Sequence, residues 1–262
     1  MSILVEQPVA LAIVNHPEDA ELLCAGTLAL LKQRCWRIVI ASMVSEEQTL
    51  EIALPSPAKP NKQATRSGHA LEIEYRCLEC PPFEIVYGDE LCRRACGLIR
   101  RVRPALVFTH GPHDATPDRE ETSRIVRQAC LTAPLEQYQT QQAAEPDEPT
   151  GRVPHLYYLD PYELIDILGR LVEAQLIVDI TTTIDIKART LAVDGNHSQA
   201  ATDCQRIERR IDTMRAWGQR RGELVGCAFG EGFRQNVGYG YPRDDLLGEV
   251  LESLVYAVNA KG

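Results

Sequence analysis

The chain has 262 residues, of which 44% are hydrophobic, and a formal net charge of −9 at pH 7. This length can bury a substantial core, and we expect one domain over residues 1–262. The acidic balance argues against nucleic acid or an anionic membrane surface as a partner, and no stretch is apolar for long enough to span a bilayer. The composition leaves open whether the chain forms a homo-oligomer.

Nine cysteines are scattered along the chain, most of them among apolar neighbours. An odd number without regular spacing indicates reduced, buried thiols rather than a disulfide framework. Cys77 and Cys80 form a lone CxxC, which is more simply structural than a metal or redox site because no second pair accompanies it. The first six residues lack the basic start and cleavage site of a secretory signal. We therefore expect a cytoplasmic protein.

In the first half of the chain, apolar runs alternate with stretches of helical periodicity. The run from Val9 to Val14 predicts a buried strand, and the apolar residues that follow at helical spacing predict a helix over 19–33. A polar loop with three prolines covers residues 45–65. The same reasoning predicts strands at 37–44, 83–87 and 104–109 and helices at 66–78, 89–101 and 120–131.

The second half begins with a loop at 134–152 that is rich in Gln, Glu, Pro and Thr. Beyond it, the sequence predicts strands at 155–159 and 176–180, and helices from Thr181–Thr183 to about 196, over 201–219 and over 244–259. Alternating strands and helices predict an α/β fold: a single Rossmann-like layer structure with a mostly parallel sheet and helices on both faces. Ligands of such sheets bind at the carboxyl ends of the strands.

Two polar segments follow predicted strands at this edge. Residues 15–22 place His16, Glu18 and Asp19 on a strand-to-helix turn, which is the composition of a metal or acid/base site. The same acids would also suit the positive end of a helix dipole without any catalytic role. The second segment, residues 110–119, lies between the predicted strand 104–109 and the helix that follows it. We expect His16 and Asp118 at the carboxyl ends of neighbouring strands.

Residues 16–20, which read His-Pro-Glu-Asp-Ala, resemble the His-Pro-Asp-Asp signature of the LmbE-like (PIG-L) de-N-acetylases. The resemblance implies that zinc is the cofactor and that His16 and Asp19 are ligands of the metal. Glu18 stands where the family has its general base, an Asp. In the implied mechanism, zinc polarises the amide carbonyl and activates a water, while Glu18 moves the proton.

Residues 114–119, which read Asp-Ala-Thr-Pro-Asp-Arg, resemble the family's Asp-x-His-Pro-Asp-His motif. The resemblance implies that Asp118 orients a neighbouring group. Thr116 stands in the place of a histidine that stabilises the oxyanion, so the Thr116 hydroxyl or the Arg119 guanidinium would have to donate there. Arg119 stands in the place of the third zinc ligand. An arginine cannot bind zinc, because it stays protonated and has no free lone pair.

Two accounts of position 119 follow. In the first, another side chain supplies the third ligand: His113 is the first choice because it lies on the same loop, and His69 and His110 are weaker ones. In the second, the guanidinium brings a permanent positive charge to the place of the cation. Glu18, Asp19 and Asp118 would then pair with Arg119 rather than repel one another.

Three further segments carry the resemblance, so that five separated motifs occur in the family's order. Residues 66–69 stand where the family has Arg-x-x-Glu, with His69 in place of the acid. Residues 178–180, Lys187 and 197–199 resemble a later Val-Asp-Ile…Lys…His-x-Ser-Gln stretch, and residues 230–234 resemble a late Ala-Glu-x-Phe segment. The resemblance implies substrate-binding roles for Arg66 and His197.

Two functions follow from these observations. One is metal-dependent hydrolysis of an N-acyl (acetamido) group on an amino sugar or a related small conjugate, as expected of a de-N-acetylase. The alternative is a non-hydrolytic or repurposed family member in small-molecule metabolism, in which Arg119 replaces the metal ligand and its charge. Metal binding separates the two.

Overall fold

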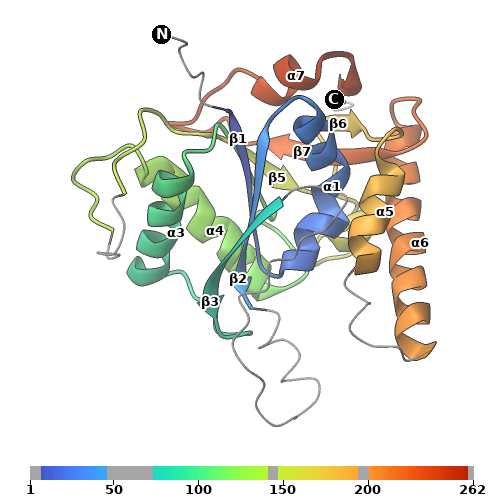
Figure 1. Cartoon of the computed structure of the whole chain (residues 1–262), viewed down its shortest axis with the longest axis horizontal. Helices are drawn as coiled ribbons and strands as arrows, with labels where there is room; N and C mark the ends of the chain where they lie inside the picture. Colours follow the sequence, from blue (N-terminus) through green and yellow to red (C-terminus); the bar gives the residue numbers. More distant parts are fainter. Residues whose placement is uncertain (1–6, 46–72, 141–146, 194–200, 259–262) are drawn as a thin grey trace.

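A computed structural model describes residues 7–45, 73–140, 147–193 and 201–258, and these residues form an eight-stranded sheet with helices on both faces (Figure 1). The strand order is β3-β2-β1-β4-β5-β7-β6-β8. The strands are β1 (Val9–Val14), β2 (Arg37–Val44), β3 (Ile73–Cys80), β4 (Leu106–Thr109), β5 (His155–Leu159), β6 (Leu176–Asp179), β7 (Gly230–Gln235) and β8 (Val255–Ala257). From β3 to β5 the strands are parallel, and β7, β6 and β8 continue the sheet antiparallel.

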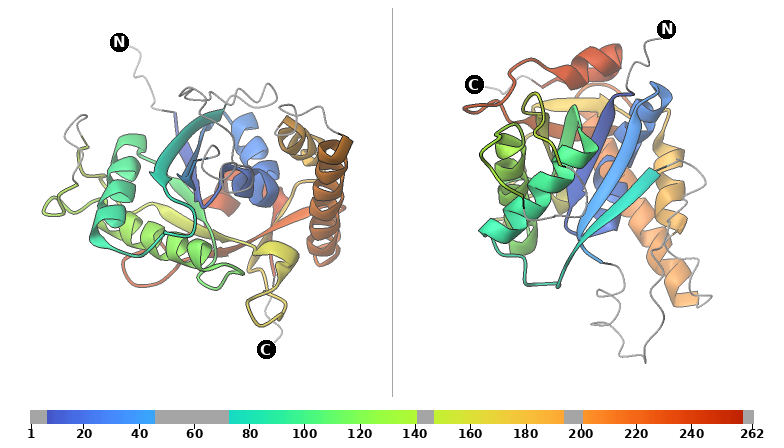
Figure 2. Two further views of the ribbon diagram at one scale, coloured as in Figure 1. Left: turned by 90° about the horizontal axis from the view of Figure 1, so that it is seen from below. Right: turned by 60° about the vertical axis from the view of Figure 1, so that its left-hand side comes forward.

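The helices divide between the two faces of the sheet (Figures 1 and 2). Helices α3 and α4 pack together on one face, and α1, α5 and α6 cover the other. Each helical layer encloses its own buried apolar cluster against the sheet. The helices are α1 (Pro17–Gln33), α3 (Asp89–Val102), α4 (Pro117–Thr132), α5 (Ile184–Val193), α6 (Ala201–Glu223) and α7 (Leu246–Leu251), with 3₁₀ turns η1 (Tyr162–Leu164) and η3 (Glu252–Leu254). The α/β class and the two helical layers are as predicted from the sequence.

The central strands are apolar along their whole length because helices cover both of their faces. Every residue of β1 and of β4 is buried. Near-continuous apolar runs are typical of parallel strands in α/β sheets. None of the described helices is long and apolar enough to cross a membrane.

The two polar segments leave the sheet at one edge. Strands β1 and β4 are parallel neighbours, with Ile13 opposite Thr109, so the segments that follow them emerge side by side. His16 follows β1, and Asp118 lies in the first turn of the helix that comes after β4. The predicted placement of both residues is confirmed. Helix α1 begins at Pro17, two residues earlier than predicted, because proline suits the first position of a helix.

The predicted helix 66–78 is wrong from residue 73 onward, and residues 66–72 lie outside the described part. Ile73–Cys80 forms the edge strand β3, paired in parallel with β2. Buried Leu78 and Cys80 alternate with exposed Glu79, and pairing with β2 outweighs the local helical pattern. The predicted strand 83–87 is wrong as well. Phe83 and Val86 are exposed there, and Ile85 alone is buried in an unpaired segment.

The predicted helix over 244–259 is wrong beyond residue 251, because a residue with positive φ ends α7 there. The Asp245 side chain accepts the Gly248 amide and starts α7, but Glu252 adopts φ 54° and the chain turns into β8. Strand β7 was not predicted, since its glycines weaken a strand pattern. A Cβ at Gly232 would lie 2.2 Å from Asp160 Oδ2, so this strand needs a glycine there.

Candidate functional site

Asp19 is the hub of the polar cluster at the carboxyl edge of the sheet. It is fully buried, in the first turn of α1. On Oδ1 it accepts hydrogen bonds from Arg119 Nη2 at 2.9 Å and from the Tyr162 hydroxyl at 2.7 Å. On Oδ2 it accepts the His16 amide at 3.0 Å, and Nε2 of His110 lies 3.3 Å away. Both oxygens are therefore engaged.

The helix start explains why Asp19 points into this cluster. Its side chain accepts the backbone amide of His16, the residue before the helix, while its own amide donates to the His16 carbonyl at 3.0 Å. This reciprocal pair caps α1 and fixes the carboxylate against the loop that follows β4. A capping aspartate can thus also hold a partner from α4.

Arg119 reaches Asp19 from the first turn of α4. Its side chain is 9% exposed, and its guanidinium stacks on the Tyr162 ring with the carbon 3.7 Å from the ring centroid. Nη1 lies 3.7 Å from Asp114 Oδ1. Burial lowers the pKa of Arg119, but Asp19, Tyr162 and Asp114 raise it by more, so the guanidinium is permanently charged.

The ionised form of Asp19 is stabilised in spite of its burial. Burial raises the pKa of its carboxyl, but His110, Arg119 and the His16 amide together hold that pKa well below its usual range. In the same way, burial beside the Asp19 carboxylate raises the pKa of the Tyr162 hydroxyl far above its usual range. The tyrosine therefore stays protonated and donates to Asp19.

His110 lies fully buried behind this pair. Its Nε2 accepts the Asn15 amide at 2.9 Å, and its Nδ1 lies 3.9 Å from Asp114 Oδ2. Four buried side-chain atoms around the pair lack a hydrogen-bond partner among the described residues: Asn15 Oδ1, His110 Nδ1, Asp114 Oδ2 and Arg119 Nε. Buried polar groups are normally bonded, so this edge of the sheet is built to hold further polar atoms.

The carboxylate of Glu18 faces a different partner. Successive residues of a helix point about 100° apart, so Glu18 turns away from Asp19 toward α6. There it pairs with Arg210 Nη1 at 3.1 Å, and its side chain remains 43% exposed. Among the acids of this turn, Glu18 is the one that solvent reaches.

Asp118 also has a partner of its own, because its Oδ2 accepts the Phe83 amide at 2.8 Å. The expectation that Glu18, Asp19 and Asp118 all pair with Arg119 is therefore wrong. The acids around the guanidinium are Asp19 and Asp114. Thr116 is the exposed residue before α4, and its hydroxyl makes no capping hydrogen bond.

Of the alternative zinc ligands, His110 lies beside Asp19, but its Nε2 already accepts the Asn15 amide. His113 is exposed on the loop between β4 and α4. Arg66, His69 and His197 lie outside the described residues.

Within the described part of the chain, no three His, Cys, Asp or Glu side chains are arranged to hold a metal ion. The donors at Asp19 also do not fit zinc. The Nδ1 of His16 lies 4.0 Å from Asp19 Oδ2, but a guanidinium and a phenol occupy the other oxygen. The chemistry of this donor set therefore disagrees with the zinc site that the resemblance implies.

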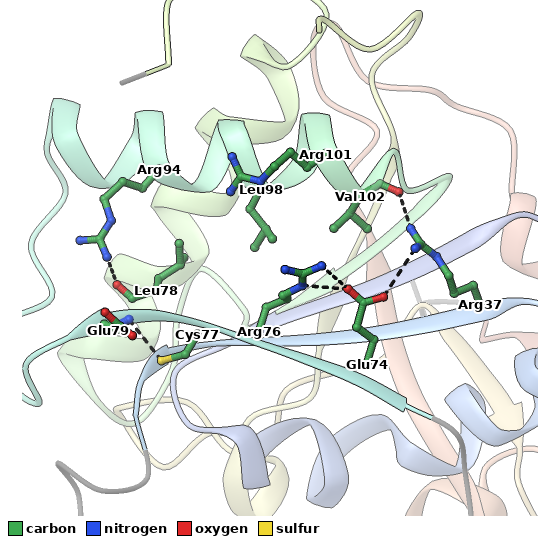
Figure 3. A pocket seen from close by; sticks show the side chains of 10 residues that line it. All are labelled: Arg37, Glu74, Arg76, Cys77, Leu78, Glu79, Arg94, Leu98, Arg101 and Val102. Carbon is green, nitrogen blue, oxygen red and sulfur yellow. Dashed lines mark hydrogen bonds and ion pairs between the residues drawn. The ribbon is translucent and has the colours of Figure 1, made fainter. Parts of the chain in front are cut away.

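A separate hollow of about 270 Å³ lies between β3 and α3 (Figure 3). Its charged side chains mostly engage one another: Glu74 is held by both Arg37 and Arg76. Arg94 donates to the Leu78 carbonyl. None of the candidate site residues that the structure describes lines it, so we do not assign the reaction to this hollow.

Sequence reasoning missed Tyr162 and Arg210 and underrated His110. The position of Tyr162 just after β5, at the same carboxyl edge as the other two segments, could have identified it as a site residue. No feature of the sequence distinguishes Arg210, because it is one of several arginines on α6 and lies 192 positions from Glu18.

Comparison with known proteins bears on this geometry. Residues 11–130 match the family model PIG-L, described as GlcNAc-PI de-N-acetylase. The matched segment runs from within β1 to within α4, so it includes both polar segments and the Asp19–Arg119 pair.

Solved structures share the fold of most of the chain. The conserved protein TT1542 from Thermus thermophilus is 24% identical, with a TM-score of 0.67 over 90% of this chain and 98% of that one. GalB, the 4-carboxy-2-hydroxymuconate hydratase from Pseudomonas putida, is 17% identical, with a TM-score of 0.68 over 91% of this chain and 98% of that one. N,N'-diacetylchitobiose deacetylase from Pyrococcus horikoshii is 17% identical, with a TM-score of 0.67 over 88% of this chain and 84% of that one. At these identities the likeness concerns the fold alone.

The Tyr162 hydroxyl should contribute measurably to stability. Changing Tyr162 to phenylalanine removes a donor to an ionised, buried acceptor and should lower the free energy of unfolding by about 1.5–3 kcal/mol. Urea denaturation at pH 7 measures the change. Tyr239, which is 97% exposed, is the matched control, and Tyr239→Phe should leave stability unchanged. Equal effects of the two substitutions would contradict the assignment.

Proposed function

We propose that this protein removes the acyl group from the amine of an N-acylated amino sugar or a small conjugate of similar chemistry. The observation that carries the proposal is the cluster of polar groups at the carboxyl edge, where the half-exposed Glu18 lies next to His16 and the buried Asp19. Two comparisons support this substrate class. The PIG-L model is described as a de-N-acetylase, and one protein of the same fold is a chitobiose deacetylase.

Glu18 is the proposed general base. Its carboxylate takes a proton from a water molecule as the water oxygen bonds to the amide carbon, and the carbonyl oxygen gains the negative charge. When the C–N bond breaks, Glu18 returns a proton to the leaving amine, which gives a carboxylic acid and an amine. Arg210, at 3.1 Å, holds the Glu18 carboxylate in place from α6.

Thr116 is the proposed donor to the oxyanion. It is exposed, and its hydroxyl is not used to cap α4. Asp118 fixes the segment beyond β3 by accepting the Phe83 amide, and so shapes the same edge. Arg66 and His197 remain proposed contacts to the substrate. Arg119 is too deeply buried to reach the substrate carbonyl without a shift of Tyr162.

The proposed setting is a cytoplasmic enzyme that acts on a small molecule, with a homo-oligomer as an allowed state. The eight described cysteines support this setting, because all of them are free thiols. Burial raises the pKa of the Cys80 thiol to about 11, so this member of the CxxC is a poor nucleophile near neutral pH.

Release of a primary amine from N-acetyl amino sugars tests the proposal. The purified protein is assayed with N-acetylglucosamine, N-acetylgalactosamine and N,N'-diacetylchitobiose. Glu18→Gln should lower kcat/KM by about 10²–10⁴-fold, because general base catalysis typically contributes that much. Glu136→Gln, on an exposed loop, is the matched control and should keep wild-type activity. The proposal fails if no substrate releases amine, or if Glu18→Gln is as active as the wild type while both remain folded.

The second candidate is a protein of the same site that binds without hydrolysis. The direct pairing of Arg119 with Asp19 favours it, since this pair stands where hydrolysis in the family is expected to use a metal. Saturable binding of an N-acetyl sugar by calorimetry, without release of amine and unchanged by Glu18→Gln, would support this second candidate over the first.

A further inference from the structure

The cation nearest to Asp19 belongs to the chain itself. Arg119 Nη2 donates to Asp19 Oδ1 at 2.9 Å, and both side chains are buried. We infer that Arg119 is the resident cation of this site and that the site works without a bound zinc ion. The inference modifies the proposed function, on which it rests for the choice of site, and concerns what holds positive charge there.

Hydrogen bonds already occupy both carboxylate oxygens of Asp19, so few of its lone pairs are free for a metal. Tyr162 shares Oδ1 with Arg119, and the His16 amide takes Oδ2. Each zinc ligand must offer a free lone pair on an uncharged or negatively charged atom. At Oδ1 it would have to displace two hydrogen-bond donors, one of them charged.

The guanidinium is also held in place by groups other than Asp19. The Tyr162 ring covers its face, and Asp114 lies on the side of Nη1. Arginine suits such a buried, planar site better than lysine, because it pairs with carboxylates and stacks on rings at the same time. The pair with Asp19 is therefore a built part of the fold rather than a surface contact.

Position 119 nevertheless faces the atoms that a metal would use. Its side chain leaves the first turn of α4 toward Asp19, and His16 Nδ1 lies 4.0 Å from the second carboxylate oxygen. A histidine at 119 would point its imidazole at the same carboxylate. Two imidazoles and one carboxylate form a usual set of protein ligands for zinc, with a position left open.

The experiment compares zinc binding by the full chain and its variants at position 119. The wild type is purified without chelator, its metal content is measured by mass spectrometry, and zinc is titrated by calorimetry. The wild type should contain far less than one zinc per chain, and EDTA should not change its Tm. Arg119→His should bind about one zinc at least roughly a hundredfold more tightly than the wild type, because it gains a direct ligand and loses a competing cation. Its Tm should rise with zinc and fall with EDTA.

Two controls separate a gained ligand from a lost cation. Arg119→Gln removes the charge without adding an imidazole and should bind zinc more weakly than Arg119→His. The double variant Asp19→Asn/Arg119→His keeps the new imidazole but loses the carboxylate, and should lose the gain. The inference is overturned if the wild type holds one zinc per chain whose removal lowers Tm. It is also overturned if Arg119→His binds zinc no better than Arg119→Gln; if Arg119→His does not fold, the wild-type measurement decides.

The amine-release assay keeps this inference separate from the proposed function. Hydrolysis that continues in EDTA supports both. Hydrolysis that EDTA abolishes and zinc restores overturns the inference and leaves the proposed function standing. A zinc-free wild type that hydrolyses nothing overturns the proposed function and leaves the inference standing.

Discussion

Replacing Glu231 by leucine should lower the free energy of unfolding by about 3–5 kcal/mol, because it leaves a buried lysine without its counter-ion. The Lys187 amine lies 2.6 Å from Glu231 Oε1, and the two side chains are 5% and 2% exposed. Glu231 also accepts the amides of Gly26 at 3.0 Å and Thr27 at 2.7 Å. One carboxylate thus joins the middle of α1 to α5 and β7.

Urea denaturation of the single and double variants measures this effect. Glu231→Leu combined with Lys187→Met should recover much of the loss, since a buried ion pair replaced by apolar side chains is often neutral in stability. Recovery will be incomplete, because the amides of Gly26 and Thr27 still lose their acceptor. A single-variant loss below about 1 kcal/mol would contradict a structural role for this carboxylate.

The location of the candidate site could be predicted from the sequence, because it depends on patterns that span few residues. The apolar runs of β1 and β4 identify buried strands, and the polar residues that follow each run lie at its carboxyl end. In parallel strands these ends share one edge, so His16 and Asp118 come together without knowledge of the full strand order.

The partners within the site could not be predicted in the same way. Glu18 and Asp19 are adjacent in sequence, yet one turns to Arg210 and the other to Arg119, because a helix separates them by about 100°. Tyr162 reaches Asp19 from 143 positions away, so no local pattern indicates that contact.

The antiparallel strands β7 and β8 could not be predicted from the sequence for a related reason. Strand β7 contains two glycines and β8 has three residues, and both are defined by pairing with strands far away in sequence. Local propensity gives little information on such strands, because contacts with their neighbours decide whether they form.

Removing Arg119 without adding a ligand should destabilise the protein most at neutral pH. Arg119→Ala leaves the buried Asp19 carboxylate without its guanidinium, with Asp114 nearby, and losses of this kind are about 3–5 kcal/mol. Arg124 lies on the same helix and stacks on Tyr87 as an exposed residue, so Arg124→Ala is the matched control. It should change stability by less than about 1 kcal/mol.

The pH dependence of this loss identifies its cause. In the wild type the pKa of Asp19 is held below its unfolded value of about 3.9, so its contribution to stability is fully present above that pH and is lost in stronger acid. In Arg119→Ala, burial and Asp114 should raise the folded pKa above the unfolded one. Stability of the variant should then fall as pH rises from about 4 toward the new pKa, while that of the wild type stays level with respect to this group. Urea denaturation of both proteins between about pH 4 and about pH 8 should show a stability difference that widens with pH. A difference that is constant over this range would mean that Arg119 acts through packing on Tyr162 rather than through the charge of Asp19.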